Sequence, residues 1–142
     1  MLFFHALHRN GAEFGYRVAH EAARYVHFHK KLGDFADGDA SWFRFAFDCV
    51  IIQKLLPKLH GSRTKLGPVL KTLWFLCLNH PTNRGLDALK SADIAARSAD
   101  KKIEPSIDPE ILEVAYYRLS AEKIGRMWRL LSDNGFTSFA EA

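Results

Sequence analysis

The chain has 142 residues, of which 48% are hydrophobic and 25% are charged. This length and balance are typical of one globular domain with a core of its own, and they exclude a disordered tail. Twenty Lys and Arg residues against 16 Asp and Glu residues give a formal net charge of +4, which is spread along the sequence. The mild excess is compatible with a nearby polyanion but singles out no nucleic-acid-binding face.

Helices are predicted almost throughout, because apolar residues recur at steps of three and four and no run alternates long enough for a strand. We therefore expect an all-α fold, a compact multi-helix bundle in a single domain, residues 1–142. In chain order the expected helices cover residues 1–10, 14–32, 42–56, 66–77 and 120–134. Residues 83–107 have weak patterning, with a helix at about 86–99, and we expect a peripheral insertion or linker there.

The helix at 14–32 is expected to bury the stripe Phe14, Val18, Ala22 and Val26 and to end before Gly33. Asp39 or Ser41 is expected to cap the next helix. Residues 42–56 are apolar on most of the helix circumference, which predicts a central core helix.

Proline and glycine residues in the middle of the chain predict helix ends and a turn. Pro57 is expected to interrupt the core helix, and Gly61 and Ser62 to form a turn. Pro68 is compatible with the following helix if it lies in the first turn.

The last helix has signals at both ends. Ser120 is the expected N-cap, with Leu119 and Ile124 as a hydrophobic staple. Gly135 is expected to end the helix in a left-handed conformation and to place Phe136 against Leu131. The expected buried stripe consists of Ile124, Met127, Trp128 and Leu131.

The two cysteines, Cys49 and Cys77, lie in apolar runs and predict buried free thiols. So few cysteines favour a reducing compartment, and we expect a cytoplasmic protein. The apolar residues 1–7 are too short to span a membrane and lack the basic region of a signal peptide. No membrane partner is therefore expected.

Histidine spacing does not predict a metal site. His20 and Glu21 begin like the zinc protease signature, but Arg24 stands where the second histidine ligand is needed. His20, His27 and His29 are better interpreted as solvated or hydrogen-bonded side chains. The sequence also has no phosphate-binding glycine loop and no nucleophile elbow, so we expect no enzyme activity from this chain alone.

Arg17 is the first candidate functional residue. It lies in the first turn of its helix, where the helix dipole disfavours a cation unless an anion is near. The side chain either reaches a phosphate held by another domain or pairs with Glu13 or Glu21, its neighbours four residues away.

A basic turn after Pro57 gives the second candidate, an anion-binding or partner surface. An ordinary solvated loop explains the same composition equally well. The candidate interface residues are Lys58, His60, Ser62 and Arg63.

Three segments resemble the C-terminal part of McrB-like AAA+ ATPases, the nucleotide-driven motors of methylcytosine-dependent restriction systems. They are FGYRVAHE at residues 14–21, the run from Phe47-Asp48 to QKLLPKLHGSR at residues 53–63, and residues 120–142 with GFTSFAE at 135–141. The similarity covers about residues 12–78 and 117–142, and PKLHGSR is its most distinctive string.

The resemblance implies that the chain is the helical lid, separate from the α/β core that holds nucleotide. In that family an arginine at the start of a lid helix, the sensor 2 residue, touches the nucleotide phosphates, and Arg17 is the matching position. It also implies ATP or GTP with Mg only together with the missing core, and partners in that core or neighbouring motor subunits, with DNA contacted indirectly. The alternative is an autonomous basic helical module that binds nucleic acid or a protein partner.

Overall fold

The computed structural model of the chain describes residues 2–9, 15–36, 39, 41–78 and 104–142. The described part is mostly helical, which confirms the expected helical class. Its elements in order are α1 (Leu2–Arg9), α2 (Tyr16–Leu32), α3 (Ser41–Val50), the π-helix η1 (Ile51–Leu55), the 3-10 helix η2 (Leu56–Lys58), β1 (His60–Ser62), α4 (Arg63–Leu78), α6 (Pro109–Val114), α7 (Arg118–Asn134) and β2 (Phe136–Ser138). Phe14 and the expected helix at 86–99 lie outside the described residues.

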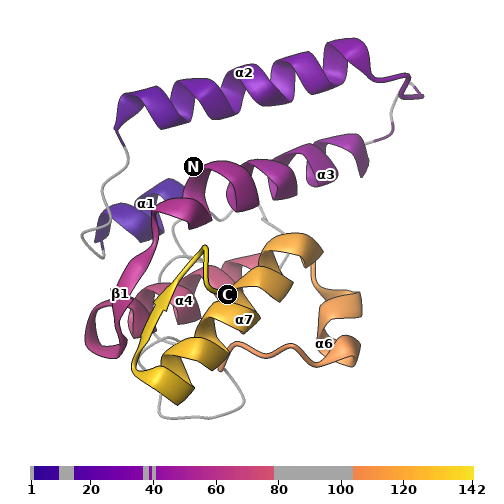
Figure 1. Cartoon of the computed structure of the whole chain (residues 1–142). Helices are drawn as coiled ribbons and strands as arrows, with labels where there is room; N and C mark the ends of the chain where they lie inside the picture. Colours follow the sequence, from indigo (N-terminus) through magenta and orange to yellow (C-terminus); the bar gives the residue numbers. More distant parts are fainter. Residues whose placement is uncertain (1, 10–14, 37–38, 40, 79–103) are drawn as a thin grey trace.

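The helices form layers around the pair α4 and α7. These two helices pack against each other, α1 packs on α4, and α3 contacts α7. Helix α2 lies over α3 as the outermost element (Figure 1). One side of α2 is therefore covered and the opposite side faces solvent.

The buried core draws on almost every described helix. Val18 and Ala22 of α2 are buried, which confirms the inward side predicted for this helix, whereas Val26 is half-buried. The largest fully buried side chains are Trp74, Leu7, Ile51, Leu55, Leu56, Leu59, Leu70, Leu73, Ile124, Met127, Leu131 and Val50.

Helix α3 is less buried than its composition predicts. Phe43 and Phe45 are 45% and 54% exposed, so the prediction of a central core helix over residues 42–56 fails for its first part, whereas Ile51, Leu55 and Leu56 further along are buried as predicted. The cause is the position of α3, which contacts α2 and α7 but leaves a side uncovered. At its start, the Asp39 carboxylate accepts the Ser41 amide at 2.8 Å, which confirms Asp39 as a capping residue.

The chain changes helix type before Pro57. The Leu56 amide donates to the Ile51 carbonyl five residues back, which widens the turn into η1. Pro57 has no N–H with which to continue an α-helical ladder, and the tighter η2 turn follows. The predicted interruption at Pro57 is confirmed, but the break begins earlier, at Ile51.

Gly61 and Ser62 lie in strand β1, so the predicted turn there is wrong. β1 pairs antiparallel with β2, with His60 opposite Ser138, Gly61 opposite Thr137 and Ser62 opposite Phe136. A strand of three residues has no alternation to detect, and its partner lies more than 70 residues further along the chain. The pairing brings PKLHGSR and GFTSFAE, two strings of the family resemblance, into one small sheet.

Pro68 lies inside α4, past the first turn, so the expectation that this proline occupies the first turn of its helix is wrong. The helix begins at Arg63, five residues before the proline. The missing Pro68 amide leaves the Thr64 carbonyl unbonded by the helix, and Thr64 is exposed to water near the helix start.

The N-terminus of α7 is capped by a residue from α3. The Asp48 carboxylate accepts the backbone amides of Leu119 and Ser120 at 2.8 and 2.9 Å, and the Ser120 hydroxyl also donates to it. Helix α7 begins at Arg118, so the prediction of Ser120 as N-cap with a Leu119–Ile124 staple is wrong. A carboxylate at a helix N-terminus also interacts favourably with the helix dipole.

The C-terminus of α7 has the predicted glycine stop, whereas no described contact places Phe136 against Leu131. Gly135 has φ 74°, a left-handed conformation that favours glycine, and its amide donates to the Leu131 carbonyl at 3.0 Å. In the predicted stripe Ile124, Met127 and Leu131 are buried and Trp128 is half-buried. Phe136 continues into β2 and stays 47% exposed.

Candidate functional site

Arg17 and Lys54 share one carboxylate on the outer side of the molecule. The Arg17 Nε atom lies 2.9 Å from Glu21 Oε1, and the Lys54 ammonium lies 3.6 Å from Glu21 Oε2. The Arg17 side chain is 90% exposed, so only Glu21 holds it among the described residues. The structure therefore gives Arg17 the Glu21 partner anticipated from spacing and leaves its guanidinium open to solvent.

The two cations act on the shared carboxyl group. The hydrogen bond from Arg17 is the main cause that lowers the pKa of Glu21; desolvation opposes it, and the charge of Lys54 adds a smaller lowering effect. The attraction of Glu21 to both cations is fully present above the usual pKa of a glutamate and is lost as the pH falls through the lowered pKa of this group. Because the group is exposed, the ion pairs contribute little to folding.

The helix type of η1 positions Lys54. A π-turn contains an extra residue, so the residues of the turn take a different direction from that of an ideal α-helix. Lys54 belongs to this turn and reaches across to Glu21 of α2, while its neighbours Ile51 and Leu55 are buried. The sequence analysis missed Lys54 as a site residue, although a lysine in so apolar a run was a usable signal.

The four residues of the predicted basic surface have different environments. Arg63 donates to the backbone carbonyls of Leu131, at 3.2 Å, and Ser132, which end α7. Its guanidinium therefore caps a helix C-terminus, where carbonyl groups favour a cation. Lys58, His60 and Ser62 are exposed on η2 and β1.

The structure does not join this basic turn to Arg17. Arg17 contacts Glu21, and the hydrogen-bond partners of Arg63 lie at the end of α7, so the two arginines share no partner. The candidate site is thus best centred on the Arg17–Glu21–Lys54 cluster.

No group of three potential metal ligands occurs among the described residues. His20 and His27 are exposed on α2, in line with the solvated interpretation. His29 differs, because it is half-buried against the rings of Tyr25 and Phe35 and its Nε2 atom has no hydrogen-bond partner.

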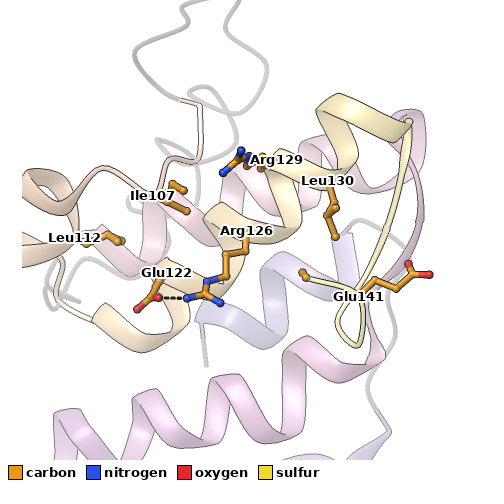
Figure 2. A pocket seen from close by; sticks show the side chains of 8 residues that line it. Ile107, Leu112, Glu122, Arg126, Arg129, Leu130 and Glu141 are labelled. Carbon is orange, nitrogen blue, oxygen red and sulfur yellow. Dashed lines mark hydrogen bonds and ion pairs between the residues drawn. The ribbon is translucent and has the colours of Figure 1, made fainter.

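Two hollows of about 410 Å³ lie on the described surface. One is an apolar groove between α2 and α3, lined by Phe4, Ala19, Ala22, Ala23, Val26, His27, Lys30, Trp42, Phe43 and Phe47. The other lies beside α7, where Arg126 pairs with Glu122 at 2.6 Å (Figure 2). Arg126 is thus paired within its own helix in the same way as Arg17, and Arg129 also lines this second hollow.

Both cysteines are free and buried, as predicted. Burial raises the pKa of the Cys77 thiol well above its usual value, and the charge of Asp48 raises it further. Burial also raises the pKa of Cys49, against an opposing hydrogen bond from Tyr25. Neither thiol is therefore poised to act as a nucleophile.

Thiol reactivity is a direct check of this packing. At about pH 8, a disulfide reagent such as DTNB is expected to label the native protein roughly a hundredfold more slowly than the protein in denaturant, because the thiols are protonated and shielded. Labelling of either cysteine at the rate of the unfolded chain would contradict the burial described here.

Comparison with known protein families matches the chain to a family model. The family described as a domain of unknown function, DUF8727, matches residues 1–136. The chain belongs to this family. No curated protein and no solved structure matches it. Among the described helices of this DUF8727 member, none is both long and apolar enough to cross a membrane.

Proposed function

We propose that the chain is a helical lid or assembly module of an McrB-like AAA+ motor in DNA restriction or a related defence role, without hydrolysis of its own. The observation that carries the proposal is the exposed guanidinium of Arg17 in the first turn of α2. An arginine there is useful to a phosphate group supplied from outside, because its planar fork binds phosphate oxygens in pairs.

Because Glu21 is shared with Lys54, little free energy is needed to separate Arg17 from this carboxylate. Glu21 accepts from Arg17 through Oε1 and attracts Lys54 through Oε2. If Arg17 turns toward a nucleotide phosphate, Glu21 keeps a cation beside it. The ion pair with Glu21 thus keeps Arg17 at the start of α2, and a nucleotide phosphate can replace the carboxylate as its partner.

Nucleotide would be held by a separate α/β core. ATP or GTP with Mg would bind to that core, and Arg17 would reach the phosphates from this chain. The partners are then the core domain or neighbouring motor subunits. The pairing of β1 with β2 brings two of the strings that carry the resemblance together in the fold.

A reconstitution experiment tests the proposal. The chain is mixed with an McrB-like core that carries the phosphate-binding loop, and hydrolysis of ATP and GTP is measured with the wild type and with Arg17→Ala. We expect Arg17→Ala to reduce hydrolysis about a hundredfold, the size of effect typical for removal of one charge-stabilising donor.

Arg126→Ala is the matched control, since Arg126 is also an exposed arginine paired with a glutamate one turn away. It should leave the rate unchanged. Equal rates for the two variants would refute the role of Arg17, and turnover of nucleotide by the purified chain alone would refute the lid assignment.

A further inference from the structure

The solvent side of α2 carries a regular row of basic side chains, here called the α2 stripe. Its members follow one another at steps of three and four residues, which places them on one side of a helix. All of them are exposed, and they are Arg17, His20, Arg24, His27 and Lys31. From Arg17 to Lys31 the row extends for about 21 Å along the helix axis.

The α2 stripe lies on the side of the helix opposite the core, although His27 at its edge also lines the groove between α2 and α3. At 100° per residue, its members lie roughly opposite Val18 and Ala22, the buried residues of the helix. α2 is also the outermost element of the described fold (Figure 1). Packing within the domain therefore does not require these side chains.

Charge is more concentrated here than the sequence as a whole indicates. Helix α2 contains four Arg and Lys residues and a single carboxylate, Glu21, so its formal net charge is +3 of the +4 of the whole chain. Helix α4 has the same formal net charge, with three cations and no carboxylate, so α2 is one of two basic helices and is the one that lies outermost (Figure 1).

On the exposed side of helix α7, two arginines have carboxylate partners on the same helix. There Arg126 pairs with Glu122 and Arg129 with Asp133, each four residues apart. Arg24 and Lys31 make no ion pair with any described residue, and neighbouring like charges on a helix cost stability. Unpaired cations in an ordered row indicate a partner that carries the opposite charge.

Exposed aromatic side chains flank the row and narrow the class of partner. Tyr16 is 88% exposed and Phe28 is 46% exposed, at the two margins of the α2 stripe. Proteins that bind single strands combine a line of cations for the backbone with aromatic rings on which bases stack. An acidic protein surface would use the cations but would have no comparable use for both rings.

We propose that the α2 stripe binds the phosphate backbone of single-stranded nucleic acid, with Tyr16 and Phe28 as stacking surfaces for its bases. Arg24 and Lys31 are the principal phosphate contacts. The inference is independent of the proposed lid function, because it rests on these two cations and the rings, whereas the lid proposal rests on Arg17.

Fluorescence anisotropy of a labelled oligo-dT tests it, with the full chain and a series of salt concentrations. We expect binding that weakens with salt. The double variant Arg24→Gln/Lys31→Gln should lower affinity about tenfold at low salt and reduce the slope of log K against log salt by about 1.4, since each phosphate contact contributes about 0.7. Tyr16→Ala should lower affinity about fivefold or more and leave the slope unchanged.

The matched control is Lys65→Gln/Arg118→Gln, which removes the same charge from exposed positions on α4 and α7. It should bind like the wild type. An equal loss in this control, no binding to oligo-dT, or equally tight binding to a DNA duplex or to polyglutamate would each overturn the proposal. Arg24→Gln/Lys31→Gln separates the two proposals, because it leaves Arg17 in place: loss of oligo-dT binding with unchanged hydrolysis in the reconstituted motor supports the α2 stripe independently of the lid role, whereas unchanged binding would overturn it.

Discussion

Replacing Asp48 with alanine is expected to lower the free energy of unfolding by about 3 kcal/mol. The carboxylate accepts the amides of Leu119 and Ser120 and the Ser120 hydroxyl, and all of these donors lie at the start of α7. Asp48 is 5% exposed, so no bulk water replaces it when it is removed. The variant would leave several donors unsatisfied and remove an anion from the positive end of the helix dipole.

Urea unfolding followed by circular dichroism measures this loss. Asp48→Asn keeps the shape and one acceptor and should cost about 2 kcal/mol, whereas Ser120→Ala, which removes a single donor, should cost about 1 kcal/mol. Asp133→Ala is the control, because Asp133 makes only an exposed 4.0 Å contact with Arg129 and should change stability by less than about 0.5 kcal/mol. A loss below about 1 kcal/mol for Asp48→Ala would contradict the capping role.

Gly125→Ala is expected to destabilise the protein by about 2 to 3 kcal/mol. Gly125 is buried in α7, where a Cβ atom would overlap the carbonyl oxygen of Ser106 and lie 2.8 Å from its carbonyl carbon. Both atoms belong to backbone, which cannot move aside as a flexible side chain can. The substitution would therefore separate the segment at residues 104–107 from α7.

Gly67→Ala in α4 is the matched control for thermal unfolding. A Cβ atom at Gly67 would lie 4.0 Å from its nearest neighbour, the Trp128 ring, so the site has room for a methyl group. Its stability should stay within about 0.5 kcal/mol of the wild type or rise, because alanine favours helix more than glycine does. A Gly125→Ala variant as stable as Gly67→Ala would show that residues near Ser106 do not pack on the helix as described.

Helices and their glycine ends could be predicted because the signals are local. The stop at Gly135 follows from the backbone freedom of glycine, and the helix end before Gly33 and the inward residues Val18 and Ala22 follow from the spacing of apolar residues. The start of α7 could not be found in this way, because its cap comes from Asp48, some 70 residues earlier. The local capping rule predicted Ser120 as the N-cap residue, whereas the Ser120 hydroxyl donates a hydrogen bond to the Asp48 carboxylate.

Prediction of the candidate site was limited by the same difference between local and distant contacts. The pairing of Arg17 with Glu21 is a matter of four-residue spacing, and the sequence indicated it as an alternative. Lys54 joins the pair only because η1 departs from α-helical geometry and α2 lies beside it, and neither fact is visible from composition. Arg63 was grouped with an exposed turn, whereas the fold uses its guanidinium on α7 carbonyls.

The pairing of β1 with β2 has a practical implication for where this domain is cut. The family match ends at residue 136, the first residue of β2, while the partners of His60 and Gly61 are Ser138 and Thr137. A fragment trimmed to the match would leave the β1 backbone as an open edge with unsatisfied amides and carbonyls. Such edges recruit other chains, so the shortened fragment would be prone to self-association, and the working boundary of the domain lies beyond residue 138.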